Sequence, residues 1–105
     1  MVSSVQSPDS KRIVLDLNEP DFLDQFLELE TADLKKVIKT FKKLRKLSWA
    51  EAYKDPGLKL EEIKSHKGLY TLRADQSSRL VVFRTQERMT FVVYQREHDA
   101  AYGKK

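Results

Sequence analysis

The segment from Gly68 to Tyr102 contains three short runs of residues that favour β-structure, and this pattern constrains the fold most strongly. The runs LYTLRA, RLVVFRT and MTFVVYQR are rich in valine, leucine, phenylalanine, tyrosine and threonine. These residue types suit a pleated, half-buried surface. The turn-forming segments DQSS and QE separate the runs. The sequence therefore predicts three strands joined by tight polar turns.

Side chains alternate between the two faces of a strand, so the pattern also predicts which residues share a face. The predicted core face consists of Tyr70, Leu72, Ala74, Leu80, Val82, Met89, Phe91 and Val93. Arg73, Arg79 and Arg96 then fall together on the opposite face. Three guanidinium groups on one face suit phosphate oxygens. Alternatively, their stems cover apolar neighbours such as Val81 or Val92 on an ordinary surface.

The chain before these strands predicts one further strand and two helices. Residues 11–17 alternate in polarity, as a strand does. We expect Asn18 to cap a first helix and Thr31 to cap a longer second one, forming an antiparallel hairpin. The apolar stripe of the first helix consists of Phe22, Leu23, Phe26, Leu27 and Leu29. The second helix has the amphipathic spacing of Leu34, Val37, Ile38, Phe41 and Leu44.

The polar side of the second helix is basic. It carries Lys35, Lys36, Lys39, Lys42, Lys43, Arg45 and Lys46. A row of cations without interleaved acids is typical of a surface that follows nucleic-acid phosphates, and we expect the lysines to bind RNA or the ribosome. Alternatively, this is a solvated helix face, because the helix dipole favours cations near a C-terminus.

A short connection lies between the helices and the three strands. Ser48 and Glu51 have the spacing of a capping box, which predicts a short helix or turn. We expect Trp49 and Tyr53, on one face of it, to fill the core rather than to stack on bases. Residues 58–66 predict either a loop or an irregular strand.

Length and composition indicate one α+β domain. The chain has 105 residues, of which 40% are hydrophobic, enough for a single core. We predict a flexible leader at residues 1–10 and one domain at residues 11–105. Its predicted order is β-α-α-β-β-β, with the N-terminal strand and helical hairpin packed on a small, mainly antiparallel sheet. No apolar run approaches the ~20 residues that a membrane span requires, so we expect no membrane partner.

The net charge of +4 hides a strong asymmetry. Residues 1–33 carry two basic and eight acidic side chains, a net charge of −6, whereas residues 34–105 carry 18 basic and eight acidic ones, a net charge of +10. A basic body favours polyanionic partners such as nucleic acid or an acidic protein segment, although the same charge also serves solubility.

The side chains available for chemistry are mainly cationic. The sequence has no cysteine, which fits a cytoplasmic location, and its two histidines lack neighbouring ligands at metal spacing. We therefore expect no metal and no other cofactor. His98 and Tyr102 follow the last strand and offer a base, a proton donor or a stacking ring.

The segment GLYTLRADQSSRLVVFR followed by VVYQREHDAAY resembles the C-terminal half of the RelE/ParE superfamily of bacterial toxin–antitoxin toxins. That family has a Tyr-x-Leu-basic strand, an Arg-Leu-hydrophobic strand, and a last strand ending in a basic or histidine-rich segment closed by tyrosine. The resemblance implies a RelE-like fold. By position, it implies catalytic roles for Arg73, Arg79, Arg96 and Tyr102, and proton transfer by His98. Thr71 stands where RelE has a further basic residue.

The resemblance also implies an activity and partners. RelE-like toxins are metal-independent, ribosome-dependent mRNA endoribonucleases, in which the ribose 2′-OH attacks the adjacent phosphate and a 5′-OH is released. The implied partners are mRNA, the ribosome and a cognate antitoxin that forms a hetero-oligomer with the toxin. Two alternatives remain open, since fold does not fix function. One is a ParE-like toxin that acts on DNA gyrase, and the other is a non-catalytic module that binds RNA or protein.

Overall fold

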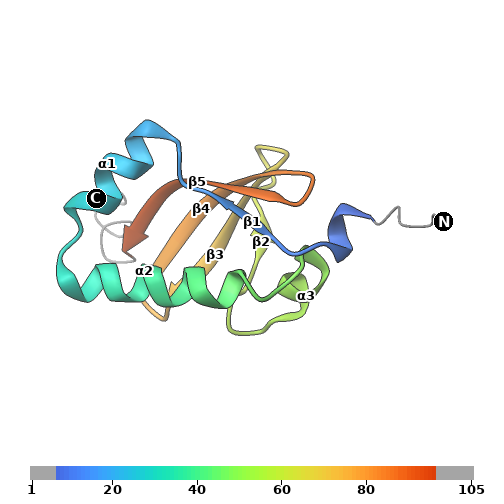
Figure 1. The fold of residues 1–105 in the computed structure, drawn as a ribbon, viewed down its shortest axis with the longest axis horizontal. Coiled ribbons are helices and arrows are strands. Elements are labelled where there is room, and N and C mark those ends of the chain that lie inside the picture. Colours follow the sequence, from blue (N-terminus) through green and yellow to red (C-terminus); the bar gives the residue numbers. More distant parts are fainter. Residues whose placement is uncertain (1–6, 97–105) are drawn as a thin grey trace.

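The computed structural model describes residues 7–96 as three α-helices, one short 3-10 helix and a five-stranded sheet. In chain order the elements are η1 (Pro8–Ser10), β1 (Val14–Asp16), α1 (Pro20–Glu28), α2 (Thr31–Leu44), α3 (Trp49–Lys54), β2 (Glu61–Glu62), β3 (Leu69–Asp75), β4 (Ser78–Thr85) and β5 (Arg88–Arg96). The predicted α+β class and the order of the major elements are confirmed (Figure 1).

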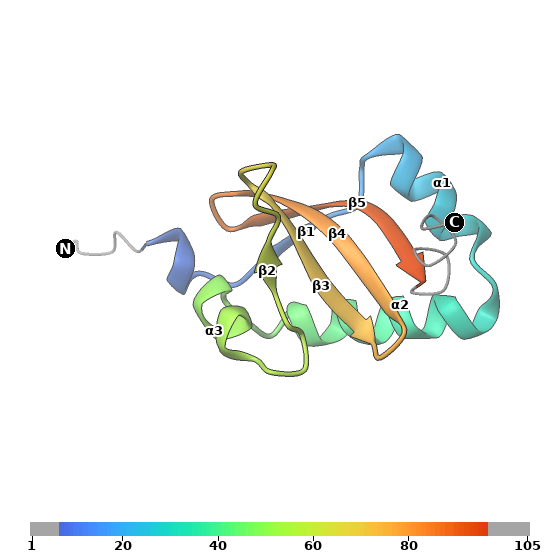
Figure 2. The ribbon, with the colours of Figure 1, turned by 180° about the vertical axis from the view of Figure 1, so that it is seen from behind.

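The sheet has the strand order β1-β5-β4-β3-β2. Only β1 and β5 pair in parallel, and the other three pairs are antiparallel, which confirms a mainly antiparallel sheet. Helices α1 and α2 pack on one face, where Phe22 and Phe41 both contact the ring of Phe91. The opposite face has no described helix in front of it (Figure 2). We refer to this second side as the open face.

The core lies between the sheet and the helices. From the sheet it receives Tyr70, Leu72, Leu80, Val82, Met89, Phe91 and Tyr94, all buried. The predicted core face is therefore confirmed except at two positions. Ala74 is only half-buried at the edge of the core, and Tyr94 takes the place of Val93. Trp49 is fully buried, and its indole N–H donates to the carbonyl of Glu87 at 3.2 Å, so it fills the core as expected. The same prediction is wrong for Tyr53, which is 42% exposed.

Both predicted helix caps are wrong. The N-cap of α1 is Glu19 and that of α2 is Glu30, and neither side chain accepts a cap hydrogen bond. Asn18 lies one residue too early because Pro20 is already the first residue of α1, while Thr31 lies inside the first turn of α2. Proline is preorganised for the first helical position, and this preference fixed where α1 begins.

The predicted capping box is present. The Ser48 hydroxyl accepts the Glu51 backbone N–H at 3.2 Å, and the Glu51 carboxylate accepts the Ser48 N–H at 2.9 Å. Residues 7–10, which fall within the predicted leader, belong to the fold: η1 contacts α3, and Asp9 forms an ion pair with Arg84.

The predicted apolar stripes are wider than the buried surface. Leu23, Leu27 and Ile38 are exposed, whereas the remaining members of both stripes are buried or half-buried. The sheet is small, so it covers only part of the apolar surface of each helix.

Candidate nucleic-acid interface

Arg73 and Arg79 face each other across the β3–β4 hairpin on the open face. They are direct partners in the antiparallel register, and their neighbours Leu72 and Leu80 point into the core. The alternation of side chains therefore turns both guanidinium groups away from the helices, as predicted.

The turn between the two arginines is held by one carboxylate. Asp75 accepts hydrogen bonds from the Ser77 N–H at 2.9 Å and the Ser78 hydroxyl at 2.6 Å. Its other oxygen lies 3.0 Å from the Lys36 ammonium group of α2. Burial alone would raise the pKa of Asp75, but the bonds from Ser78, Lys36 and the Ser77 N–H outweigh it and lower the pKa to about 2. An ionised Asp75 thus fixes the hairpin end against α2.

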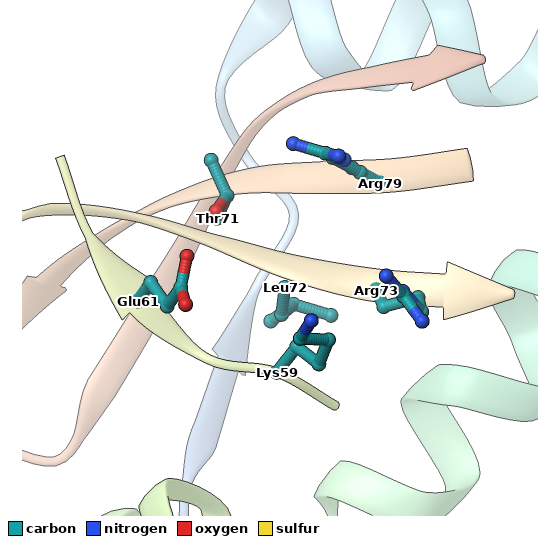
Figure 3. Close-up of a pocket in the computed structure, with 6 residues that line it drawn as sticks. All are labelled: Lys59, Glu61, Thr71, Leu72, Arg73 and Arg79. Carbon is teal, nitrogen blue, oxygen red and sulfur yellow. The ribbon is translucent and has the colours of Figure 1, made fainter. Parts of the chain in front are cut away.

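The first of two clefts beside the arginines opens on the sheet (Figure 3). It has a volume of about 60 Å³. Its lining consists of Lys59, Glu61, Thr71, Leu72, Arg73 and Arg79. In Figure 3 the Glu61 carboxylate points toward Thr71, its partner in the β2–β3 register. Among the described residues that line this cleft, three are cationic and one is acidic.

Lys59 reaches the first cleft through an unusual backbone conformation. Its φ is +46°, in the left-handed region that non-glycine residues seldom adopt. The buried side chains of Leu58 and Leu60 hold it from both sides, and the Leu58 carbonyl accepts the Arg73 N–H at 2.6 Å. Residues 58–66, predicted as a loop or an irregular strand, therefore bring a cation and, through β2, a carboxylate next to the arginine pair.

The second cleft lies between β3 and α2, with a volume of about 390 Å³. Its lining consists of Lys36, Lys39, Thr40, Lys43, Gly57, Leu58, Arg73, Ala74 and Asp75. Arg73 lines both clefts and so connects them. Together they form one basic surface, made up of Lys36, Lys39, Lys43, Lys59, Arg73 and Arg79.

Part of this basic surface is neutralised internally. Lys36 pairs with Asp75, and the Lys43 ammonium lies 3.0 Å from the Asp55 carboxylate. The hydrogen bond from Lys43 lowers the pKa of Asp55 despite partial burial. Lys39 and Lys59 form no ion pair with any residue of 7–96, so their charge remains available for an anionic ligand.

The predicted lysine row is divided in two by the fold. Lys36, Lys39 and Lys43 lie on one helical face and line the second cleft. Lys35, Lys42 and Lys46 are exposed and line neither of the two clefts. Only the first group is adjacent to the arginine pair.

The last strand reverses its side-chain alternation at a β-bulge. Val81 pairs with Val93, yet the next residue of β4, Val82, pairs with Phe91. Val92 is therefore an extra residue in β5, and every side chain after it changes face. This bulge explains why Val93 is not in the core.

The bulge also separates Arg96 from the other two arginines. Gln95 is the partner of Arg79 on the open face, whereas Arg96 pairs with the buried Ser78. The Arg96 guanidinium lies 3.6 Å from the Asp33 carboxylate of α2. The prediction that three arginines share one face is wrong for Arg96, because it assumed an uninterrupted strand.

Two of the predicted site residues cannot be placed, and one residue of the first cleft was not predicted. His98 and Tyr102 lie outside the described residues. Glu61 was missed because no local pattern indicates that a two-residue strand will pair beside Thr71.

Within residues 7–96, no group of histidine and acidic side chains is arranged to hold a metal ion. No described helix is long and apolar enough to cross a membrane.

No family model matches the sequence, and no curated protein matches it either. One similar solved structure is a copper-bound mutant toxin from Helicobacter pylori, which is 18% identical. The match covers 83% of this chain and 97% of that chain with a TM-score of 0.47. A likeness at this level does not indicate a function for this chain.

Proposed function

We propose that this protein is the toxin of a bacterial toxin–antitoxin system and cleaves mRNA without a metal ion. The observation that carries the proposal is the cross-strand pair Arg73–Arg79 on the open face, in one cleft with Lys59 and Glu61. Two guanidinium groups fixed by a hairpin register suit a phosphate whose charge increases in the transition state. The sequence resemblance to RelE-like toxins assigns the same two arginines to catalysis.

The proposed reaction is a transfer within the RNA strand. The ribose 2′ oxygen forms a bond to the adjacent phosphorus, the bond from phosphorus to the 5′ oxygen breaks, and a cyclic phosphate remains. Glu61 is placed to accept the proton of the 2′-OH, since it is the carboxylate lining the first cleft. The departing 5′ oxygen requires a proton, which His98 or Tyr102 would donate according to the resemblance.

The second cleft supports a nucleic-acid substrate. Lys39, with no ion pair in the described chain, lies between Lys36 and Lys43 along the wall of this cleft. Phosphate contacts of this kind position a strand without reading its sequence. We therefore assign the second cleft to the RNA backbone next to the cleaved bond.

A separate groove fits the expected antitoxin. It lies between β1 and α2, has a volume of about 620 Å³, and is lined by Arg12, Ile13, Val14, Leu15, Leu17, Phe41 and Arg45. β1 is an edge strand, which offers unpaired backbone groups to another chain. An amphipathic acidic segment of an antitoxin would match the apolar floor and the two arginines. The proposal places both proteins in the cytoplasm as a hetero-oligomer.

The test is expression of the toxin alone in a bacterial host, followed by primer extension on a translated reporter mRNA. We expect discrete cuts within translated codons and growth arrest. The double variant Arg73→Ala/Arg79→Ala should abolish both while remaining folded by circular dichroism. The matched control Arg12→Ala/Arg45→Ala removes two arginines from the separate groove and should cut as the unmodified protein does.

Other outcomes point to the alternatives. Arrest without cuts would overturn the nuclease assignment in favour of another target such as DNA gyrase. Absence of arrest, with RNA binding retained, would indicate a non-catalytic binding module. Cuts that persist in the double variant would remove the arginine pair from the active site.

A further inference from the structure

Phe83 differs from every other phenylalanine in the protein. Phe22, Phe26, Phe41 and Phe91 pack against one another in the core, with ring centroids between 4.8 and 6.0 Å apart. Phe83 instead lies on the open face, and 42% of its surface is exposed. Leaving one large aromatic side chain in water forgoes the stabilisation that burial gives the other four.

The Phe83 ring is held in a defined position. Its neighbours in the sheet register are Leu69 on β3 and Thr90 on β5. Gly68, with φ of +90°, lies directly against it: a Cβ atom at Gly68 would be only 2.9 Å from Cε1 of the ring. The absence of a side chain at Gly68 therefore lets the ring rest close to the backbone.

Phe83 and Arg79 lie on the same strand and the same face. They are four residues apart, about 13 Å along β4. Between them the open face presents Val81, flanked by Thr71 and Val93, all half-buried and uncharged. The open face thus has a guanidinium pair at one end and an exposed aromatic ring at the other. Uncharged residues of β3, β4 and β5 lie between them, with Glu61 of β2 beside Thr71.

We infer that Phe83 is a stacking platform for one base of a single-stranded RNA whose phosphate is held by Arg73 and Arg79. This inference rests on the proposed function and adds a substrate contact to it. A π-face binds any base, so the contact positions the strand without specifying its sequence. The basic surface at the other end of the strand favours a polyanion over an apolar protein segment as the occupant of this face.

The experiment measures binding of a fluorescein-labelled 2′-O-methyl RNA of about eight nucleotides by anisotropy at low salt. This RNA lacks the 2′-OH and cannot be cleaved. We expect Phe83→Leu to weaken binding about tenfold and Phe83→Trp to preserve it. Leu27→Ala, which shortens an exposed apolar side chain on α1, is the matched control and should leave affinity unchanged.

An abasic scan of the same RNA identifies the stacked base. Removing the base at one position should weaken binding to the unmodified protein about tenfold, with no further loss in Phe83→Leu. The Phe83 ring resonances in the unmodified protein should also shift upfield with RNA, which tests the contact without any variant. Equal affinity of Phe83→Leu, or unmoved ring resonances, would overturn the inference.

Failure of the inference and of the proposed function can be told apart. If RNA stacks on Phe83 but the protein cleaves no mRNA, the inference holds and the proposed nuclease function is wrong. If Phe83→Leu makes the same codon-specific cuts and binds RNA with the same affinity as the unmodified protein, the nuclease function holds and the stacking inference is wrong. A third outcome is that the unmodified protein is a dimer, that Phe83→Leu is a monomer, and that the two bind RNA with equal affinity. The open face would then be a contact between copies of the chain, and the inference would be overturned.

Discussion

Strands β3, β4 and β5 of the five-stranded sheet contribute to both of its faces, and the two faces have opposite chemistry. The helix-covered face is continuous and apolar, with Leu80, Met89 and Phe91 at 0% exposure. The open face carries Arg73 and Arg79 at one end and the exposed Phe83 at the other. A side-chain period of two lets neighbouring residues serve opposite purposes, so stability and the candidate site are encoded in alternate positions of one segment.

The largest expected contrast between the faces is in stability. Phe91→Ala should lower the free energy of unfolding by about 3–5 kcal/mol, because it leaves a cavity between the sheet and both helices. Phe83→Ala should lower it by about 1 kcal/mol or less, because that ring is already partly in water. Urea unfolding measures both, and equal losses would contradict the division of the two faces.

The next contrast concerns arginines separated by the bulge, and it depends on the proposed function. Arg79→Ala should reduce the rate of mRNA cleavage by about 100- to 1,000-fold, as loss of a transition-state donor does. Arg96→Ala should reduce it by less than about tenfold, because Arg96 lies on the helix-covered side beside Asp33. Single-turnover cleavage in a purified translation system compares them. Equal losses would show that Arg96 reaches the phosphate despite its position.

A smaller effect is expected where the hairpin end meets α2. The pKa of Asp75, about 2, lies below its ordinary value of 3.8, so its ionised form stabilises the fold above about pH 4. This contribution is lost as the pH falls through 2. Allowing for solvent screening, Asp75→Asn should lower the free energy of unfolding by about 1 kcal/mol at pH 7.

The pH dependence separates the charge of Asp75 from other effects of the substitution. The stability difference between Asp75→Asn and the unmodified protein should shrink as the pH approaches 2. Asp24→Asn, which removes an exposed carboxylate of α1 by the same substitution, is the matched control. A difference independent of pH would mean that Asp75 acts through its shape and not its charge.

The smallest contrast is between two single lysines of α2. Lys39→Glu, in the second cleft, should weaken RNA binding and reduce the slope of log affinity against log salt by about 1. Lys35→Glu makes the same charge change outside both clefts and should have little effect. Anisotropy over a salt series measures the two slopes. Identical slopes would mean that α2 attracts RNA only through its total charge.

Local sequence patterns are sufficient to predict the major elements and most of the core. The amphipathic spacing of residues 34–44, the three β-rich runs and the Ser48–Glu51 capping box are local patterns, and each produced the expected structure. That Arg73 and Arg79 share one face was also accessible, because side chains alternate within each strand. Their direct pairing depends on a register shift between Arg73 and Asp75, which the sequence does not indicate.

Tertiary structure alone decided how the site is assembled. The bulge at Val92 moved Arg96 to the other face. Residues 91–94 are an unbroken apolar run, so the sequence does not show where the alternation is interrupted. The pairing of β2 placed Glu61 beside Thr71, and the packing of α2 decided which lysines line a cleft. Each of these depends on contacts between segments far apart in the chain, whose energies no local sequence pattern contains.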